Sequence, residues 1–592
     1  MRFLKPDKTS TTKCRLRLRA VWGCRLLTIA ICLTPLALSG QENTPQTRSK
    51  QDDLDKLVYK AEQERIRIVQ STLKSAISIF GPGGNGGGSG VVISADGYAI
   101  TNFHVTQPCG THMKCSMPNG KLYDAVIVGV DPTGDVALIK LFSEEPLPFA
   151  KLADSNEVEV GQWCFAVGNP FLLATDFQPT VTYGLVSGVH RYQYPSGTLL
   201  EYTDCIQVDA SINPGNSGGP LYNMKGELIG INGRGSFEKR GRVNVGVGYA
   251  ISINQVKNFL DYLKSGRIVD HATLGAQVFS DADGQVVVNN ILSTSDAYRR
   301  GLRYGDEIVF FADRPIHHAN DFKNVLGIYP KGWRVPLTFR REGVLNTIQV
   351  RLAGVHRPAE LLNAVEKGAP AQRPPGQKKL PKNHKVVSNP KEYEQKKGYA
   401  NYYFNELHRK RVWDRFVKVT DWKKTEANWQ LKFTDQNSST VELGLNENQV
   451  GGLFPLGPEL LDLSKDLDQQ LVPLGSGGLL VAAHLWKHLL QEGPEKFGEL
   501  YYLGAMPLPT MQNKQEVFVA VHDVVECRFY FDSETGLLSL LELYPDEMTD
   551  PCEIYFTNYQ VQEGMKVPVH WRVIWSDFEF SNMQLKELKI TK

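Results

Sequence analysis

The sequence carries almost no excess of charge of either sign, because 66 lysines and arginines are balanced by 64 aspartates and glutamates, a net charge of +2. This balance argues against nucleic acid or an anionic membrane surface as the partner of the whole chain. A phosphate-binding loop of the GxxxxGK(S/T) type is missing, and so is a tight cluster of cysteines and histidines with zinc spacing. We therefore expect a protein that needs neither ATP nor a metal ion nor another cofactor.

The apolar run near the N-terminus, residues 26–38, is thirteen residues long and contains a proline. A membrane-spanning helix needs about twenty apolar residues, so this run is too short to be one. A basic segment precedes this run, and small residues stand at its end, Ala37 within it and Ser39 directly after it. This order is typical of a secretory signal peptide. We predict a signal peptide over residues 1–40 and a periplasmic or secreted protein, with membrane contact only through an uncleaved signal.

One serine stands among glycines in the segment NPGNSGGP, residues 213–220. A serine hydroxyl becomes a nucleophile when a base takes its proton and donors stabilise the developing oxyanion. Because glycine adopts positive φ, consecutive amides in such a segment can point at one oxygen. We predict that Ser217 attacks and that the amides of Gly215 and Ser217 form the oxyanion hole. A plain glycine-rich turn between two strands is the alternative.

Upstream residues supply the partners that this serine needs. A predicted hairpin, with strands around residues 91–93 and 98–103, delivers His104. Asp131 opens an Asp-Pro-x-Gly turn, whereas Asp135 directly precedes the alternating strand at residues 136–140. We interpret Asp131 as turn chemistry and Asp135 as the acid that orients His104. The order His104, Asp135, Ser217 then gives the nucleophile, base and orienting acid of a catalytic triad.

These motifs resemble the HtrA (DegP/DegS-type) family of trypsin-like serine proteases. The matching segments are TNFHV at 101–105, DVAL at 135–138, GNPF at 168–171, VTYGLVS at 181–187, GNSGGP at 215–220 and GVGYAI at 246–251. The resemblance covers roughly residues 54–355. It implies a chymotrypsin-like pair of six-stranded β-barrels with the triad between them, and a homotrimer assembled through the protease domains.

The family resemblance also indicates where a substrate side chain would bind. The predicted pocket residues are Asn213, Ile231, Asn232, Gly233 and Val247. No acidic residue stands at an obvious pocket base among residues 246–249. A small apolar pocket favours small aliphatic side chains before the cleaved bond rather than lysine or arginine.

A second module follows the protease. The segment GLRYGDEIV at 301–309 matches the helix-to-strand signature of a PDZ domain, and the expected peptide-binding loop contains Leu274, Gly275 and Ala276. PDZ domains bind a peptide as an added strand, with loop amides holding its terminal carboxylate. We predict that this domain binds the C-termini of peptides. A PDZ fold that only supports the protease is the alternative.

The domain boundaries follow from composition. We predict a mainly β protein with an N-terminal helical lead-in at 41–75, a protease domain at 76–265 and a PDZ domain at 268–355. Residues 356–395 mix six prolines with six lysines and predict a semi-extended linker. Residues 396–592 predict a separate α+β domain with an antiparallel sheet and one helix near 478–490. This domain is faintly similar to lipoprotein-carrier (LolA-like) domains.

Cysteines and histidines outside the triad have weaker signals. Cys109 with Cys115, and Cys527 with Cys552, are candidate disulfides in an oxidising compartment. His484 and His488 share one helix face, but without a third ligand we expect no metal site there.

The sequence therefore predicts an ATP-independent serine endopeptidase that cleaves misfolded or unfolded envelope proteins. Its partners would be unfolded polypeptides and peptide C-termini, and not nucleic acid. The alternative is a peptide-binding chaperone or envelope scaffold in which proteolysis is latent.

Overall fold

A computed structural model describes most of the chain. The described residues are 45–81, 87–170, 176–194, 199–237, 244–366, 391–422, 428–447, 449–470, 478–522, 525–544, 549–576 and 578–591. The predicted signal peptide at 1–40 lies outside them. Within these ranges, no helix combines the length and the apolar character needed to cross a membrane.

The chain forms two compact units, residues 1–63 and residues 64–592. Helix α1 (Pro45–Leu73) runs from the first unit into the second. In the first unit its exposed apolar side chains include Leu54 and Val58. In the second unit Ile68, Val69 and Leu73 pack against the core of the protease barrels, because they lie on one face of the helix.

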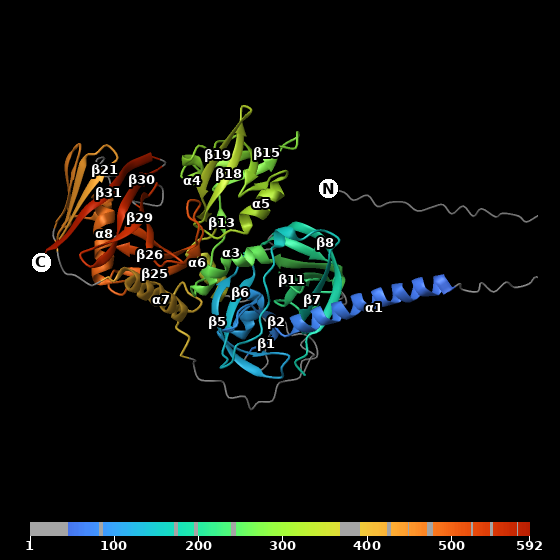
Figure 1. Ribbon diagram of the computed structural model, residues 1–592. Helices are drawn as coiled ribbons and strands as arrows, with labels where there is room; N and C mark the ends of the chain where they lie inside the picture. Colours follow the sequence, from blue (N-terminus) through green and yellow to red (C-terminus); the bar gives the residue numbers. More distant parts are fainter. Residues whose placement is uncertain are drawn as a thin grey trace, which may run out of the picture. The chain divides into compact units, whose positions relative to one another are not determined.

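Two closed β-barrels follow, each made of six strands (Figure 1). The strands of the first are β1 (Ala76–Phe80), β2 (Gly87–Val92), β3 (Tyr98–Thr101), β4 (His112–Ser116), β5 (Leu122–Asp131) and β6 (Val136–Leu141). Those of the second are β7 (Trp163–Gly168), β8 (Thr180–Gln193), β9 (Tyr202–Val208), β10 (Pro220–Asn223), β11 (Leu228–Phe237) and β12 (Asn244–Ser252). The chymotrypsin-like double barrel predicted from the sequence is confirmed.

Short helical segments and one longer helix complete the protease domain. They are α2 (Phe103–Thr106), η2 (Gln107–Cys109), η3 (Ser155–Glu157) and α3 (Ile253–Lys264). The sequence predicted that His104 lies at the end of a strand. In the structure it lies in the single turn of α2 instead. A strand cannot continue there because the backbone must turn to place the His104 amide on Asp135.

A PDZ domain forms the next sheet, with strand order β14-β15-β16-β18-β19. Its elements are β13 (Ala272–Thr273), β14 (Ala276–Ser280), β15 (Val286–Ile291), α4 (Asp296–Arg299), β16 (Glu307–Phe311), β17 (Arg314–Pro315), α5 (Ala319–Gly327), β18 (Arg334–Arg341), β19 (Val344–Arg351) and β20 (Ala353–Gly354). Apolar residues of these elements form a core of their own, which includes Leu302, Phe311 and Leu337.

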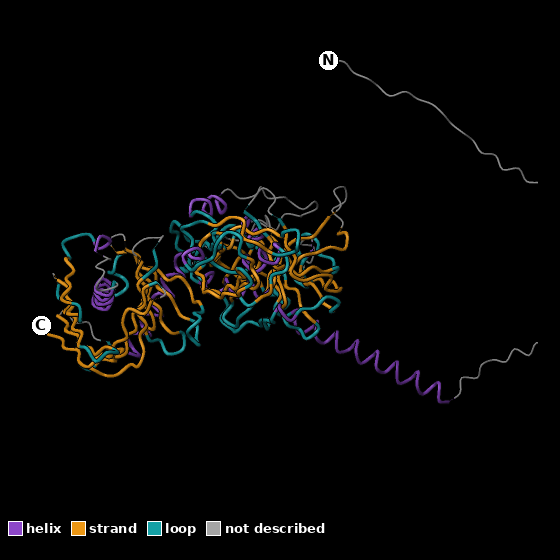
Figure 2. Tube along the Cα trace, turned by 90° about the horizontal axis from the view of Figure 1, so that it is seen from above, coloured by secondary structure: helices purple, strands orange, loops and turns teal. Residues whose placement is uncertain are grey.

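The C-terminal domain is one antiparallel sheet of eleven described strands that curls around helix α8 (Figure 2). Its helical elements are α7 (Tyr402–Thr420), η5 (Leu467–Gln470) and α8 (Leu479–Glu492). Its strands are β21 (Asn428–Asp435), β22 (Thr440–Leu445), β23 (Gln449–Phe454), β24 (Gly457–Asp462), β25 (Glu499–Met506), β26 (Gln515–His522), β27 (Val525–Asp532), β28 (Leu538–Tyr544), β29 (Cys552–Gln562), β30 (Met565–Trp575) and β31 (Phe578–Thr591). Side chains of α8 such as Leu485 and Trp486 pack inside the curl and form part of its hydrophobic core.

Two features of this region differ from the sequence prediction. Helix α7 was not predicted, and residues 358–366 of the predicted linker form helix α6 (Pro358–Glu366). Leu361 of α6 is buried against the first barrel, so tertiary packing orders the start of a proline-rich segment. Residues 367–390 of the predicted linker lie outside the described residues.

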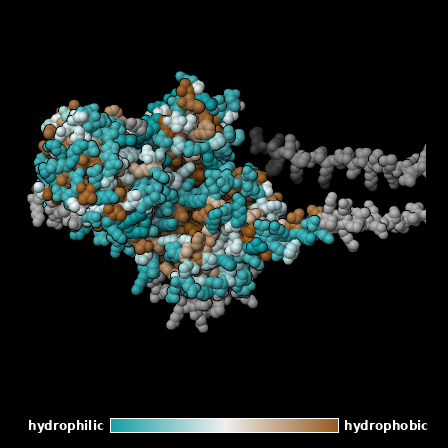
Figure 3. All heavy atoms as spheres, viewed as in Figure 1, coloured by the Kyte–Doolittle hydropathy of each residue, from teal (hydrophilic) through white to brown (hydrophobic). Residues whose placement is uncertain are grey.

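The surface seen in Figure 3 is mostly hydrophilic, with apolar residues in small groups.

The predicted disulfides are not formed in the structure. The six cysteines among the described residues are free and buried. Cys527 and Cys552 both pair with Leu543, on opposite sides of β28, so two strand spacings of about 4.8 Å separate them. A disulfide needs Cα atoms within about 7 Å, and this register therefore excludes the Cys527–Cys552 bond. Cys109 donates its thiol proton to the Val105 carbonyl at 3.2 Å, and neither Cys109 nor Cys115 is in a disulfide in this structure.

Candidate active site

The loop that carries Ser217 depends on glycine. Gly215 and Gly218 have φ angles of 102° and 83°, in the region that residues with a Cβ rarely adopt. A Cβ on Gly218 would lie 2.2 Å from the Ser89 carbonyl oxygen and from Thr101 Oγ1. The two positions therefore need glycine for conformation, and Gly218 needs it for space as well.

Ser89 of β2 anchors this loop to the first barrel. Its amide donates to the Ser217 carbonyl at 2.9 Å, and its hydroxyl donates to the Gly215 carbonyl at 2.7 Å. The same hydroxyl accepts the Asn169 amide at 2.8 Å. Sequence reasoning missed Ser89, although its flanking glycines, Gly88 and Gly90, signal close backbone approach.

The amides of Gly215 and Ser217 donate to no protein acceptor within the part of the chain that the structure describes. The amide between them behaves differently, because Asn216 donates to the Asn213 carbonyl at 2.9 Å. Two unused donors that flank a serine hydroxyl can receive an oxyanion. The geometry of the loop is therefore compatible with the predicted oxyanion hole.

His104 and Asp135 form a hydrogen-bonded pair. His104 Nδ1 lies 2.8 Å from Asp135 Oδ2, and the His104 amide donates to Asp135 Oδ1 at 3.0 Å. The Asp135 side chain is 1% exposed, whereas that of His104 is 45% exposed. The histidine is therefore oriented through its inner nitrogen, and its other edge remains accessible.

Desolvation of the inner edge of the His104 ring opposes its protonation, but the charge of Asp135 and their hydrogen bond outweigh this effect. The pKa of His104 is therefore raised above its ordinary value of 6.5. A base in this state takes a proton more readily than a free histidine, and it is neutral only above the raised pKa.

Ser217 is not hydrogen-bonded to His104 in this structure. Its hydroxyl donates instead to the Gly233 carbonyl at 3.2 Å. Catalytic hydrogen bonds are often long or absent without substrate and tighten when it binds. Rotation about the Ser217 Cα–Cβ bond is the change that would turn the hydroxyl from Gly233 toward His104.

Tyr202 is a member of the site that sequence reasoning missed. It begins β9, is 4% exposed, and donates its hydroxyl to Asp135 Oδ2 at 2.6 Å. The residue lies 67 positions after Asp135, so no local pattern linked the two.

A second histidine–aspartate pair is formed by Asp131, four positions before Asp135, and the distant His271. Asp131 accepts the amides of Thr133 and Gly134 at 3.1 and 2.8 Å, which confirms its role in the turn. Its Oδ2 also lies 2.8 Å from His271 Nε2, with both side chains at most 4% exposed. The ring of His271 stacks on Phe259 with centroids 4.4 Å apart.

The predicted pocket residues fall into two groups. Ile231 and Asn232 are fully buried, and the Asn232 side-chain amide donates to the Pro220 carbonyl at 3.1 Å inside the barrel. Both side chains are therefore covered by protein, although they point to opposite faces of β11, and neither lines an open pocket. Asn213 and Val247 are partly exposed, whereas Gly233 is buried against the ring of Tyr202. Beside Val247, a Cβ on Gly248 would lie 2.7 Å from Ile212 Cδ1, so Ile212 limits the space.

The predicted peptide-binding loop of the PDZ domain precedes an edge strand. Strand β14 pairs only with β15 among the described strands, and α5 packs beside it. Gly275 has a φ of 70°, and its amide donates to Thr273 Oγ1 at 3.2 Å. Leu274 is buried at 3% exposure, so it anchors the loop, while Ala276 begins the edge strand.

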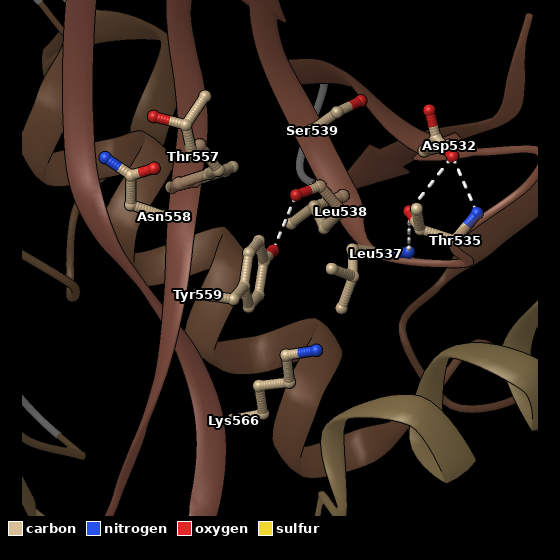
Figure 4. Close-up of a pocket in the computed structure, with 10 residues that line it drawn as sticks. Asp532, Thr535, Leu537, Leu538, Ser539, Thr557, Asn558, Tyr559 and Lys566 are labelled. Atoms are coloured by element: carbon tan, nitrogen blue, oxygen red, sulfur yellow. Dashed lines mark hydrogen bonds between the residues drawn. The ribbon is translucent and has the colours of Figure 1, made fainter. Parts of the chain in front are cut away.

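Other candidate sites are less developed. His522 joins His484 and His488, its ring 4.8 Å from that of His488, yet no group of three ligands in the described ranges is arranged for a metal ion. A shallow pocket of about 360 Å³ lies between β28, β29 and β30, where Tyr559 donates to the Leu538 carbonyl at 2.5 Å (Figure 4). Neither the histidine group nor this pocket contains a residue of the triad.

Comparisons with known proteins identify two domains in the chain. A trypsin-like peptidase domain matches residues 88–231, and a PDZ domain matches residues 272–352. A probable periplasmic serine endoprotease DegP-like of Chlamydia trachomatis is 34% identical over 290 residues, 46% of this chain and 54% of that protein. The periplasmic serine endoprotease DegP of Salmonella typhimurium is 37% identical over 293 residues, 46% of this chain and 59% of that protein.

The solved structure of the HtrA-type protease AlgW with tripeptide is 28% identical and covers 50% of this chain and 98% of its own, with a TM-score of 0.41. The chain spans between half and three fifths of the length of the two curated relatives. The two domain matches fall on the barrels and on the PDZ sheet. Residues 88–231 are therefore similar to trypsin-like peptidase domains and residues 272–352 to PDZ domains, and over 46% of its length the chain resembles the DegP endoproteases.

Proposed function

We propose that this protein is an ATP-independent serine endopeptidase. His104 takes the proton of Ser217 as the hydroxyl attacks the peptide carbonyl, and later gives it to the leaving amine. Asp135 keeps His104 in one tautomer, and the amides of Gly215 and Ser217 stabilise the oxyanion. The observation that carries the proposal is the Asp135–His104 hydrogen bond beside a serine loop with two unused amides.

The substrates would be misfolded or unfolded proteins of the cell envelope. Two relatives are named periplasmic serine endoproteases, which supports a periplasmic or secreted location. The close approach of Ile212 to Gly248 favours small aliphatic side chains before the cleaved bond. A long basic side chain would meet no acidic residue at this place, and it would not fit.

The PDZ domain would bind C-termini of substrates or activating peptides on the free edge of β14. A peptide strand can add to that edge with Leu274, Gly275 and Ala276 at its end. We also propose a homotrimer. An exposed stack of Trp163 and Tyr183 on the second barrel, with centroids 4.9 Å apart, is suited to a subunit contact.

The test is digestion of unfolded casein by the purified protein beside its Ser217→Ala variant, followed by sequencing of the fragment ends. We expect cleavage after small aliphatic residues, and the variant should lose about 10⁴- to 10⁶-fold in turnover. Size-exclusion chromatography with light scattering checks the trimer. Cleavage that persists in Ser217→Ala would show that another residue is the nucleophile.

A chaperone or scaffold is the second candidate, and one observation favours it. The Ser217 hydroxyl faces the Gly233 carbonyl rather than His104, which is the arrangement expected if proteolysis is latent. In that case neither protein would cut casein, even with added hydrophobic C-terminal peptides. Stable complexes with unfolded clients and unchanged function of Ser217→Ala in cells would then identify the scaffold.

A further inference from the structure

The carboxylate of Asp135 has a donor besides His104. The hydroxyl of Tyr202 donates to Oδ2 at 2.6 Å, and the same oxygen takes His104 Nδ1 at 2.8 Å. The other oxygen, Oδ1, takes the His104 amide at 3.0 Å. A buried carboxylate needs hydrogen-bond donors on both of its oxygens. The Tyr202 hydroxyl is the second donor to Oδ2, the oxygen that also contacts the His104 ring.

The ring of Tyr202 also packs against the backbone that holds the nucleophile. A Cβ on Gly233 would lie 2.6 Å from Tyr202 Cε1 and 2.8 Å from its hydroxyl oxygen. The Gly233 carbonyl accepts the Ser217 hydroxyl at 3.2 Å. One tyrosine therefore contacts both the acid that orients the base and the peptide unit that holds the serine.

We propose that Tyr202 is a positioning residue of this site, whose hydroxyl fixes the Asp135 carboxylate against His104 and whose ring fixes Gly233. The proposal rests on the proposed function. Because the hydroxyl shares Oδ2 with His104, it withdraws part of the negative charge that the imidazolium would otherwise feel. Tyr202 thus holds the orientation of Asp135 and limits how strongly Asp135 favours protonated His104.

The charged surroundings keep this hydroxyl in its donor form. Burial and the Asp135 carboxylate raise the pKa of Tyr202 well above its usual value, and the more distant Arg234 only partly offsets them. Cys205, on the same strand, is a buried neutral thiol whose pKa burial also raises. Among the groups that shift His104, Asp135 is the charged one. A change at Tyr202 should therefore reach His104 through Asp135.

The first test is Tyr202→Phe, which removes one oxygen and keeps the ring. We expect kcat to fall about tenfold with KM unchanged, because a hydrogen bond to a charged group is lost away from the substrate. The acidic limb of the kcat/KM profile should move to higher pH, because Asp135 then favours imidazolium more strongly. Tyr192→Phe is the matched control, since Tyr192 donates to Glu201 and touches no triad residue; it should change neither quantity.

The second test replaces Tyr202 with 3-fluorotyrosine, a stronger donor that retains the hydroxyl and the fold. Here the acidic limb should move to lower pH, opposite to the shift in Tyr202→Phe. A fall in kcat without a limb shift in Tyr202→Phe would reduce Tyr202 to a packing residue and overturn the proposal. So would kcat within twofold of wild type and an unmoved limb.

A readout without turnover separates this proposal from the proposed function. NMR titration of isotope-labelled histidine, assigned with His104→Gln, should show a higher His104 pKa in Tyr202→Phe than in wild type. If wild type neither cleaves casein nor reacts with a fluorophosphonate at Ser217, the proposed function fails, and the titration still decides the role of Tyr202. Equal His104 titrations in the two proteins would overturn it.

Discussion

Two aspartates four positions apart, Asp131 and Asp135, each pair with a histidine at 2.8 Å, yet the two pairs have different surroundings. The His104 side chain is 45% exposed. The His271 side chain is 4% exposed, and its ring is covered by Phe259. The chemistry of the two pairs is the same, and access to solvent and substrate distinguishes them.

This difference shows how the loop between β5 and β6 combines stability and catalysis. Asp131 and His271 fix the turn that leads into Asp135, and a Cβ on Gly134 would lie within 3 Å of both side chains. Asp135 itself has a φ of 58°, so its backbone is held in an unusual conformation. A buried ion pair on one side of the turn therefore maintains the geometry of the half-exposed pair on the other.

The largest expected effect separates the two aspartates by activity. Asp135→Asn should lower kcat/KM for casein peptides about 10⁴-fold, because the wrong histidine tautomer then faces Ser217. Asp131→Asn should lower it less than about tenfold, since Asp131 touches no reacting group. Initial rates at pH 8 with matched circular dichroism spectra check both. Equal losses in the two variants would mean that the turn, not the tautomer, limits catalysis.

Stability should separate the two histidines in the opposite sense. His271→Ala should lower the free energy of unfolding by about 3–5 kcal/mol, because it leaves Asp131 as an uncompensated buried charge. His104→Ala should cost about 1 kcal/mol or less, because His104 is half exposed and Tyr202 still bonds Asp135. Urea unfolding followed by tryptophan fluorescence measures both. A smaller loss for His271→Ala than for His104→Ala would contradict the comparison.

The two pairs should also respond differently to pH. Burial lowers the pKa of His271, but the Asp131 charge and hydrogen bond outweigh it, so the folded-state value is raised above 6.5. Its contribution to stability is then complete below pH 6.5 and is lost as the pH rises through the raised pKa. Activity should change in the other direction, because His104 must be neutral and its pKa is raised too.

Unfolding curves from pH 5 to 9, beside kcat/KM over the same range, check this prediction. The pH-dependent loss of stability in this window should shrink in His271→Ala, while the acidic limb of activity should remain. If His271→Ala moved the acidic limb of activity and left the stability curve unchanged, His271 would control the pH dependence of activity rather than that of stability.

Local sequence patterns predicted those site residues whose role is indicated by a short motif around them. Ser217, its glycines, His104 and the turn at Asp131 follow from neighbours within a few positions. Ser89, Tyr202 and His271 act through contacts that span 67 or more positions, and no periodicity encodes such contacts. The double barrel was predictable from the family resemblance, whereas the eleven-stranded sheet was predictable only as an antiparallel α+β domain.

Helix α7 shows the same limit outside the active site. Its sequence has no clear apolar stripe, because it is held by polar contacts as well as by packing. The amides of Asn401 and Asn405 donate to the carbonyls of Ile127 and Ser265, both at 2.9 Å, in the protease domain. A helix that is stabilised by distant carbonyls carries little of that stability in its own periodicity.

The smallest expected effect concerns the aromatic cover that only one histidine pair has. Phe259→Leu removes the ring that stacks on His271 but keeps an apolar side chain, so it should cost about 1–2 kcal/mol of unfolding free energy. Casein cleavage should remain within about twofold, because Phe259 stacks on His271 within the hydrophobic core and forms no hydrogen bond in the triad. A double-mutant cycle with His271→Ala isolates the stacking contribution from the lost volume. A coupling energy near zero would mean that Phe259 only fills space, and that the Asp131 hydrogen bonds hold the His271 ring without it.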